Sequence, residues 1–372
     1  MSGAAPGDVL SPDALEARLR AIGAERYHHR HPFNVRMHEG RLTRDELRTW
    51  ALNRYYYQTR IPVKDSLIVS KAGDAAFRRE WVQRIHDHDG EREGDGGLAL
   101  WLRLAEAVGC DAAEVERQEH VLPGVRRACD AYVELVQTSD LLTSVAASLT
   151  EMFAGDIMAV RIAAFEKHYP WVEAGGLAYF RSRTQQAPRD AAWGLRYVRE
   201  HATDATSQAR AAAALERKCD ILWSLLDAVE RACARPRLAP HAQLRFDSAL
   251  ERWLCVLPER AVALGGSGRD ILERCTGDET SEAIARALAA RPGAGPHARD
   301  EVHDFLEQMA RHGVLRFLPA GAARAGEAAT ARPLAADTGA RAPDGPATDG
   351  CPHAGAEPAA GASRTARRDG PQ

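Results

Sequence analysis

The 372-residue chain lacks the sequence features of several large protein classes. None of its seven cysteines forms a Cys-x-x-Cys pair, and most fall in helical segments, as free thiols do in a reducing cytosol. The net charge of −3 offers no basic surface for nucleic acid. No apolar run reaches the length of a membrane span, and the N-terminus has no basic region followed by an apolar stretch. We therefore expect a cytoplasmic protein that binds neither nucleic acid nor a membrane.

Strand-like alternation is also absent from residues 10–235, where nearly every segment repeats its apolar residues at helical spacing. Apolar residues make up 45% of the chain, which is enough for a sizeable core. The spacing predicts an all-α bundle of roughly seven or more helices. The predicted elements are a helix opened by the capping box of Thr43 and Glu46, a new helix beginning at Pro62, one capped by Asp74, and later helices near 98–108, 125–136, 141–168, 177–185, 189–201 and 205–233.

A change of composition after the helical region predicts a second domain. Two prolines in residues 235–240 indicate a linker, and residues 241–319 then combine short strands with helices. Strands are expected at 253–257, 260–264 and 314–317, and a capping box of Ser267 and Asp270 is expected to open the first helix. This order predicts a small α+β, winged-helix-like domain. Residues 320–372, in which Ala, Gly, Pro, Thr and Asp dominate, predict a disordered tail.

The charge of the small domain argues against DNA binding, which a winged helix otherwise suggests. Residues 241–317 contain ten Arg, no Lys and twelve Asp or Glu. A net acidic domain binds phosphate poorly. We therefore predict a peptide partner, bound along a strand edge or in a helix groove.

One predicted helix carries charged groups on its apolar face. Phe77, Trp81, Arg84 and His88 follow one another at steps of four, three and four residues, so they share one face. A face that buries Phe and Trp also buries the guanidinium and the imidazole. Because an isolated buried charge is costly, an anion is expected opposite Arg84 and His88.

Other predicted helices repeat this pattern, mostly with cations. Arg54 and Gln58 continue one apolar stripe, Lys218 lies within another, Tyr179 and Arg183 are four residues apart, and Thr150, Glu151 and Arg161 belong to a central segment. Each residue taken alone is compatible with a helix edge from which the side chain reaches water. Together they favour a closed pocket for a polyanion with several carboxylates, which suit the geometry of Arg.

A di-iron site is a second interpretation, because helical bundles can hold two irons between Glu and Glu-x-x-His motifs. The chain contains one such motif, from Glu25 to His28, whereas a di-iron site uses two facing copies. We therefore expect no metal, and metal analysis of the protein separates the two interpretations.

Several of these segments together resemble pyrroloquinoline quinone synthase over about residues 10–235. The motifs that carry the resemblance are RYYYQ at 54–58, IP at 61–62, WVQRI at 81–85, DHDG at 87–90, HVLPGV at 120–125, SLTE at 148–151, HYPW at 168–171, YFRSR at 179–183 and KCDILW at 218–223. Residues 241–319 resemble the small peptide chaperone of the same pathway. The resemblance therefore implies a fusion of two proteins in one chain.

This resemblance implies a heme-oxygenase-like helical bundle that forms a homodimer and uses neither a metal nor an organic cofactor. The family performs the last step of quinone cofactor synthesis, a ring closure and eight-electron oxidation by O2 that releases hydrogen peroxide. Its substrate is a bicyclic quinone precursor that bears carboxylates, which matches the expected polyanion pocket. The chaperone family binds the precursor peptide and presents it to a radical SAM enzyme.

The resemblance also implies which residues line the pocket. The substrate-binding residues would be Tyr27, His28, Arg54, Gln58, Lys64, Arg84, Tyr132, Thr150 and Arg161, and the catalytic residues His88, Glu151, Tyr179, Arg183 and Lys218. Met158 departs from the family, which usually has His at this position. The oxygen site is therefore expected to differ here.

Charge indicates how these residues would act on a substrate with carboxylates. The cations Arg54, Arg84, Arg161 and Lys218 would neutralise the carboxylates. His88 is the first candidate for acid–base catalysis because imidazole titrates near neutrality, and Lys218 is the alternative if neighbouring cations lower its pKa. Arg183, Tyr179 and His88 would stabilise superoxide or peroxide. A third interpretation is a non-catalytic scaffold for the peptide and the radical enzyme, inactive because of Met158.

Overall fold

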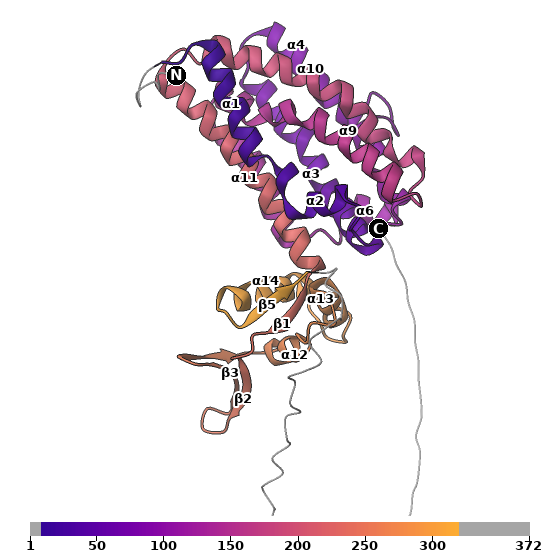
Figure 1. Cartoon of the computed structure of the whole chain (residues 1–372), viewed down its shortest axis with the longest axis vertical. Helices are drawn as coiled ribbons and strands as arrows, with labels where there is room; N and C mark the ends of the chain where they lie inside the picture. Colours follow the sequence, from indigo (N-terminus) through magenta and orange to yellow (C-terminus); the bar gives the residue numbers. More distant parts are fainter. Residues whose placement is uncertain (1–8, 320–372) are drawn as a thin grey trace, which may run out of the picture. The chain divides into compact units, whose positions relative to one another are not determined.

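The computed structural model describes residues 9–319, most of which form helices (Figure 1). The long helices of the first region are α1 (Pro12–Arg26), α3 (Arg44–Lys71), α4 (Ala75–Asp89), α5 (Gly96–Ala107), α7 (Pro123–Thr138), α9 (Glu151–His168), α10 (Ala178–His201) and α11 (Ala205–Cys233). Shorter helices are α2 (Pro32–His38), α6 (Ala112–Arg117) and α8 (Leu141–Ala147), and 3₁₀ turns lie at His28–Arg30, Ser148–Thr150 and Ala174–Leu177. Residues 9–234 contain no strand, which confirms the predicted all-α region.

Side-chain caps fix the beginnings of the helices that carry the site. Thr43 and Glu46 form the predicted capping box of α3: the Thr43 hydroxyl accepts from the Glu46 amide at 3.2 Å, and Glu46 Oε2 accepts from the Thr43 amide at 2.8 Å. Asp74 accepts from the amides of Ala76 and Phe77 and caps α4, also as predicted. These caps satisfy amides that have no partner inside the helix, which is why helix beginnings are recognisable in a sequence.

Two prolines lie inside helices where the sequence predicted a boundary. Pro62 is in the middle of α3, so the prediction of a new helix at Pro62 is wrong. Pro188 lies inside α10, which joins the two helices predicted at 177–185 and 189–201. A proline removes one backbone hydrogen bond and crowds the preceding turn. Both helices bury residues along their whole length, and this packing outweighs the local cost.

The segment predicted as one helix over residues 141–168 consists of three elements. α8 ends at Ala147, a 3₁₀ turn follows, and α9 begins at Glu151. Within the described residues this run is the one stretch long and apolar enough to cross a membrane, although the sequence analysis predicted none. Of its most apolar window, 56% is buried inside the protein, and the run carries the buried Arg161. This is the pattern of a helix in the core of a bundle.

The helices that supply the site surround one hydrophobic core. α3 contacts α4, α5, α7 and α11, α10 packs along α9, and α11 packs against α1, α7 and α8. Figure 1 shows α1 beside α11 and α9 beside α10. Trp50, Trp101, Phe165 and Phe180 are each at most 1% exposed. Burial of such side chains stabilises the fold by about 25 cal/mol per Å² of apolar surface.

The second region is a small α+β domain with its own hydrophobic cluster. Its elements are β1 (Arg235–Leu238), β2 (Gln243–Asp247), β3 (Arg252–Leu257), β4 (Arg260–Leu264), α12 (Gly268–Glu273), α13 (Ser281–Ala289), α14 (Ala298–Arg311) and β5 (Leu315–Leu318). β2, β3 and β4 form an antiparallel sheet in that order, and β1 pairs with β5, with Arg235 opposite Leu318. The predicted strands are β3, β4 and β5, so the α+β prediction is confirmed, whereas β1 and β2 were not predicted.

Two expectations for this domain are wrong. Residues 235–238, predicted as part of a linker, form β1, in which Pro236 pairs with Phe317 of β5. Proline is tolerated there because each strand of a two-stranded sheet is an edge. Ser267 precedes α12 but its side chain makes no capping hydrogen bond, so the predicted capping box with Asp270 does not form.

Six of the cysteines lie in the described residues, and all six are free thiols, as predicted. Burial raises the pKa of Cys129 and Cys233 to about 12, which makes these thiols poor nucleophiles. The seventh, Cys351, lies outside the described residues, as does the whole segment 320–372 predicted to be a disordered tail.

Gly23→Ala should destabilise the bundle. A Cβ at Gly23 in α1 would lie 1.8 Å from the ring of Phe153 in α9, and that ring also packs 5.3 Å from the ring of Tyr27. Displacing Phe153 should cost about 1–3 kcal/mol of unfolding free energy, measured by chemical denaturation. Gly73→Ala is the matched control, because nothing lies within 4 Å of its Cβ position. Equal stability of the two variants would contradict the prediction.

Candidate functional site

The residues predicted to form the site lie inside the helical bundle. The following are each at most 8% exposed: Tyr27, His28, Arg54, Gln58, Lys64, Arg84, His88, Tyr132, Thr150, Arg161, Tyr179, Arg183 and Lys218. The side chain of Glu151 is 15% exposed. These residues come from α3, α4, α7, α9, α10 and α11 and from the turns that precede α2 and α9. Long helices far apart in the sequence therefore meet at one buried polar region.

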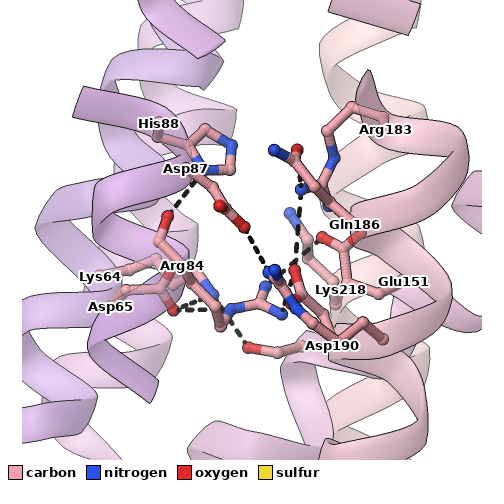
Figure 2. Close-up of polar contacts among 12 residues, drawn as sticks. Lys64, Asp65, Arg84, Asp87, His88, Glu151, Arg183, Gln186, Asp190 and Lys218 are labelled. Atoms are coloured by element: carbon pink, nitrogen blue, oxygen red, sulfur yellow. Dashed lines mark hydrogen bonds and ion pairs between the residues drawn. The ribbon is translucent and has the colours of Figure 1, made fainter. Parts of the chain in front are cut away.

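The anions that lie opposite Arg84 on the apolar stripe of α4 are carboxylates of the protein itself. The Arg84 guanidinium forms ion pairs with Asp190 at 3.0 Å, with Asp65 at 3.5 Å and with Glu151 at 3.5 Å (Figure 2). Burial acts to lower the pKa of Arg84, but the carboxylates of Asp190, Asp65 and Glu151 outweigh it and raise the pKa above its usual value. The protein itself therefore supplies the anions expected opposite Arg84.

Two further cations share these carboxylates. Arg183 Nη2 donates to Glu151 Oε2 at 2.6 Å, and its Nη1 lies 3.6 Å from Asp190. Lys64 Nζ donates to Asp65 Oδ1 at 2.5 Å. Burial acts to raise the pKa of Glu151, but Arg183 and Arg84 lower it to about 2. We call Lys64, Arg84, Arg183, Asp65, Asp190 and Glu151 the paired cluster, because in it three cations meet three carboxylates.

Three other buried cations lack a carboxylate partner among residues 9–319. They are Arg54, Arg161 and Lys218, which we call the unpaired cations. The Arg54 guanidinium lies 3.9 Å from the centre of the Tyr57 ring, and Lys218 Nζ donates to the Tyr57 hydroxyl at 2.8 Å. Arg161 Nη2 donates to Asn34 Oδ1 at 3.1 Å, and its Nε is buried without a partner. The interior therefore carries an excess of positive charge.

Arg161, Lys218 and the nearby His28 have lowered pKa values. Burial, followed by the charge of Arg54, lowers the pKa of Arg161 to about 10 and that of Lys218 well below its usual value. Burial and the nearby cations Arg54 and Arg161 also lower the pKa of His28. Burial is the largest cause of each shift, and repulsion from neighbouring cations adds to it. A bound polyanion would offset that repulsion.

His88 presents a free ring nitrogen to the site. Its Nδ1 lies 3.0 Å from the backbone oxygen of Arg84, and a carbonyl oxygen can only accept, so Nδ1 carries the proton. Burial and the charge of Arg183 lower the pKa of His88 to about 4, below the near-neutral value expected from the sequence. The ring is neutral at neutral pH, and its Nε2 lone pair can accept a proton. Figure 2 shows His88 and Arg183 on facing helices.

Neutral residues add further contacts within the buried polar region. The Tyr179 hydroxyl donates to Gln58 Oε1 at 2.8 Å. Lys64 Nζ donates to the Ser148 hydroxyl at 3.0 Å, which in turn lies 3.3 Å from the Tyr132 hydroxyl. The remaining predicted members, Tyr27, His28 and Thr150, are buried at the turns, with Tyr27 edge-on to His28 at 4.3 Å. The predicted residues are therefore joined in several local sets of contacts.

Sequence reasoning identified Glu151 but missed the other two carboxylates and three polar neighbours of the site. They are Asp65, Asp190, Asn34, Tyr57 and Ser148. Asp190 had a recognisable signal, because it lies seven residues after Arg183, two helical turns along the same face. Met158, which replaces the family's usual His, is 6% exposed and lies on α9 between Glu151 and Arg161. Within residues 9–319, no group of three His, Cys, Asp or Glu side chains is arranged to hold a metal ion.

Comparison with known proteins defines the class of protein. Residues 16–228 match the TENA/THI-4/PQQC family, more than half of the chain. A TenA homolog from Pseudomonas syringae pv. tomato has a similar fold, with a TM-score of 0.50 and 13% identity, over 62% of this chain and 99% of that chain. The chain therefore belongs to the TENA/THI-4/PQQC family, and its bundle has the heme-oxygenase-like fold predicted from the sequence.

Within this family the chain is similar to proteins of pyrroloquinoline quinone (PQQ) synthesis. A pyrroloquinoline-quinone synthase from Granulibacter bethesdensis is 50% identical over 62% of this chain and 91% of that protein. Residues 252–315 match Coenzyme PQQ synthesis protein D (PqqD). A bifunctional coenzyme PQQ synthesis protein C/D from Methylorubrum extorquens is 48% identical over 62% of each chain. The chain thus joins a PqqC-type domain and a PqqD domain, which confirms the predicted fusion.

His88→Asn should make the stability of the protein less dependent on pH. The pKa of His88 is about 4 in the folded protein and 6.5 for an unperturbed histidine, as in the unfolded chain. Between these pH values the folded protein therefore binds fewer protons than the unfolded chain. The free energy of unfolding should therefore decrease by about 3 kcal/mol as the pH falls from 6.5 to 4, because His88 gains a proton in the unfolded chain before it does in the folded protein. Urea unfolding across this range measures the slope. An unchanged slope in the variant would show that the pKa of His88 is not lowered by folding.

Proposed function

We propose that the helical bundle is a pyrroloquinoline-quinone synthase, an oxidoreductase that uses O2 to close a ring of a quinone precursor and to oxidise it by eight electrons. The products would be PQQ and hydrogen peroxide, and the reaction would use neither a metal nor an organic cofactor. The observation that carries this proposal is the set of unpaired cations, Arg54, Arg161 and Lys218, buried without a carboxylate partner in the described residues. A substrate with several carboxylates supplies the missing anions.

Similarity to enzymes of this name supports the proposal. Besides the Granulibacter protein, a pyrroloquinoline-quinone synthase from Gluconobacter oxydans is 46% identical over 63% of this chain and 98% of that protein. Both alignments cover nearly the whole length of the relatives. The similarity therefore extends over the complete bundle, including the helices that supply the site.

Binding and orientation follow from the charges. Arg54, Arg161 and Lys218 would pair with substrate carboxylates inside a site that is closed to water, where ion pairs are strong. Pairing with the substrate would also return the pKa of Lys218 toward its usual value, because it offsets the repulsion from Arg54. The bound ring would then lie beside His88 and Tyr179.

Proton removal and oxidation would take place on the side of His88. Its Nε2 lone pair makes it the base of first choice. Lys218, whose pKa burial and Arg54 lower, is the alternative only where no substrate carboxylate pairs with it. The reduced ring of the substrate would itself pass electrons to O2. Arg183 and the Tyr179 hydroxyl would stabilise the superoxide or peroxide that forms, because preorganised charge favours the developing anion.

The small domain would act in the same pathway. Its match to PqqD supports a role in binding a peptide or another partner of PQQ synthesis. We propose that it binds the precursor peptide and presents it to a radical SAM enzyme. The exposed strand β2, on which Phe246 is 50% exposed, offers an open edge for such a peptide. We further propose that the protein is a cytoplasmic homodimer.

Purified full-length protein treated with a chelator should convert the ring-open precursor to PQQ and consume oxygen. Absorbance of the product and an oxygen electrode record the two quantities together. Turnover without metal is expected because the substrate is the reductant. Restoration of turnover only after iron is added would favour the di-iron interpretation. Binding of the precursor without turnover under both conditions would favour the scaffold.

His88→Asn in the same assay should lower kcat by about 10²–10⁴-fold, the usual contribution of a general base, and leave the Kd for the product nearly unchanged. The matched control is His241→Asn, which replaces an exposed histidine of the small domain and should behave as the wild type. Equal losses of binding and turnover in His88→Asn would assign His88 to substrate binding.

A further inference from the structure

The carboxylates of the site are confined to one side of it. Asp65 is fully buried and Asp190 is 7% exposed. Together with Glu151 they form ion pairs with Lys64, Arg84 and Arg183, but with none of the unpaired cations. Two buried Asp carboxylates in a site for an anionic substrate are unexpected, since like charges repel. They therefore need a reason other than substrate binding.

Asp190 is itself held firmly from outside the site. Its Oδ1 accepts from Arg189 Nε at 3.1 Å and from Arg189 Nη2 at 2.7 Å, and Arg189 also pairs with Asp87. This leaves Oδ2 to face Arg84 at 3.0 Å and Arg183 at 3.6 Å. The two guanidiniums are therefore anchored by one carboxylate whose own orientation is fixed.

Asp65 holds the opposite side of Arg84 in the same way. Its Oδ1 accepts from Trp81 Nε1 at 2.8 Å and from Lys64, and it lies 3.5 Å from Arg84 Nε. Arg84 is thus held between α3 and α10. His88 lies one helical turn further along α4, where its Nδ1 donates to the backbone oxygen of Arg84. The two Asp residues therefore act on Arg84, and Asp190 also on Arg183, without reaching the unpaired cations.

We propose that Asp190, together with Asp65, is a positioning residue for the reaction: it neutralises Arg84 and Arg183 and fixes them beside His88, so that the substrate carboxylates are directed to Arg54, Arg161 and Lys218. This inference rests on the proposed function. Without Asp190, Arg84 and Arg183 would keep only Asp65 and Glu151 as partners, and the uncompensated positive charge would compete for the substrate carboxylates. Binding would then become tighter while the ring would be held in the wrong place, and only interactions made in the transition state raise kcat.

The test uses Asp190→Asn in the full-length protein, with binding of PQQ measured by absorbance titration and kcat measured with the precursor. Asn keeps the size of the side chain and can accept from Arg189, but it removes the negative charge. We expect kcat to fall by about 10²-fold, because a misplaced substrate reacts slowly, while the Kd for PQQ decreases. Asp190→Glu restores the charge and should return the Kd to the wild-type value.

The matched control is Asp130→Asn, which removes one carboxylate from the exposed surface of α7, where Asp130 accepts from Tyr56 at 2.8 Å. It should leave both quantities unchanged. If Asp190→Asn does not fold, Arg189→Gln is the second variant, because it removes the partner that holds Asp190 from the exposed side. It should lower both kcat and the Kd for PQQ, each by a smaller factor than Asp190→Asn. Parallel loss of kcat and binding, or an unchanged kcat, would overturn the inference. Failure of the proposed function is distinct, because the wild type would then show no turnover.

Discussion

Arg84 is surrounded by three carboxylates in the interior of the bundle, and the polar core is built around this arrangement. The three partners come from α3, α9 and α10, while Arg84 itself belongs to α4, so one guanidinium connects four helices. Removing one partner of a buried ion pair costs about 3–5 kcal/mol, because the other charge is left uncompensated. The arrangement therefore couples the packing of these helices to the geometry of the site. It also explains how α4 can carry Arg84 on the same stripe as Phe77 and Trp81.

Aromatic rings take the place of counterions for the cations that the carboxylates do not reach. Lys218 Nζ lies 3.4 Å from the centre of the Tyr132 ring, and the Arg161 guanidinium lies 5.2 Å from that of Trp50. The negative face of such a ring stabilises a desolvated cation by about 2 kcal/mol or more, which is less than a carboxylate provides. These cations can thus remain buried and still gain from a carboxylate that enters from outside. The core is consequently stable before substrate binds and attractive to an anion.

The site was predictable where its residues lie on one helix, and it was missed where two helices meet. Arg84 and His88 were recognised because they continue the stripe of Phe77 and Trp81. Asp190 was missed because the sequence predicted a break between residues 185 and 189, which separated it from Arg183. The error came from Pro188, whose local preference for a helix boundary is overcome by packing along α10.

The helical bundle, most helix beginnings, the separate α+β region and the identity of the buried cations were predictable, because apolar periodicity and capping residues act over a few neighbouring residues. Which cations the protein neutralises and which it leaves for a ligand was not predictable in this way. That distinction depends on distances between side chains more than a hundred residues apart, such as Arg84 and Asp190. The pKa of His88 depends on both the local sequence and the tertiary structure: its burial follows from the apolar stripe of α4, whereas the charge of Arg183, which lowers the pKa further, comes from another helix and is not visible in the local sequence.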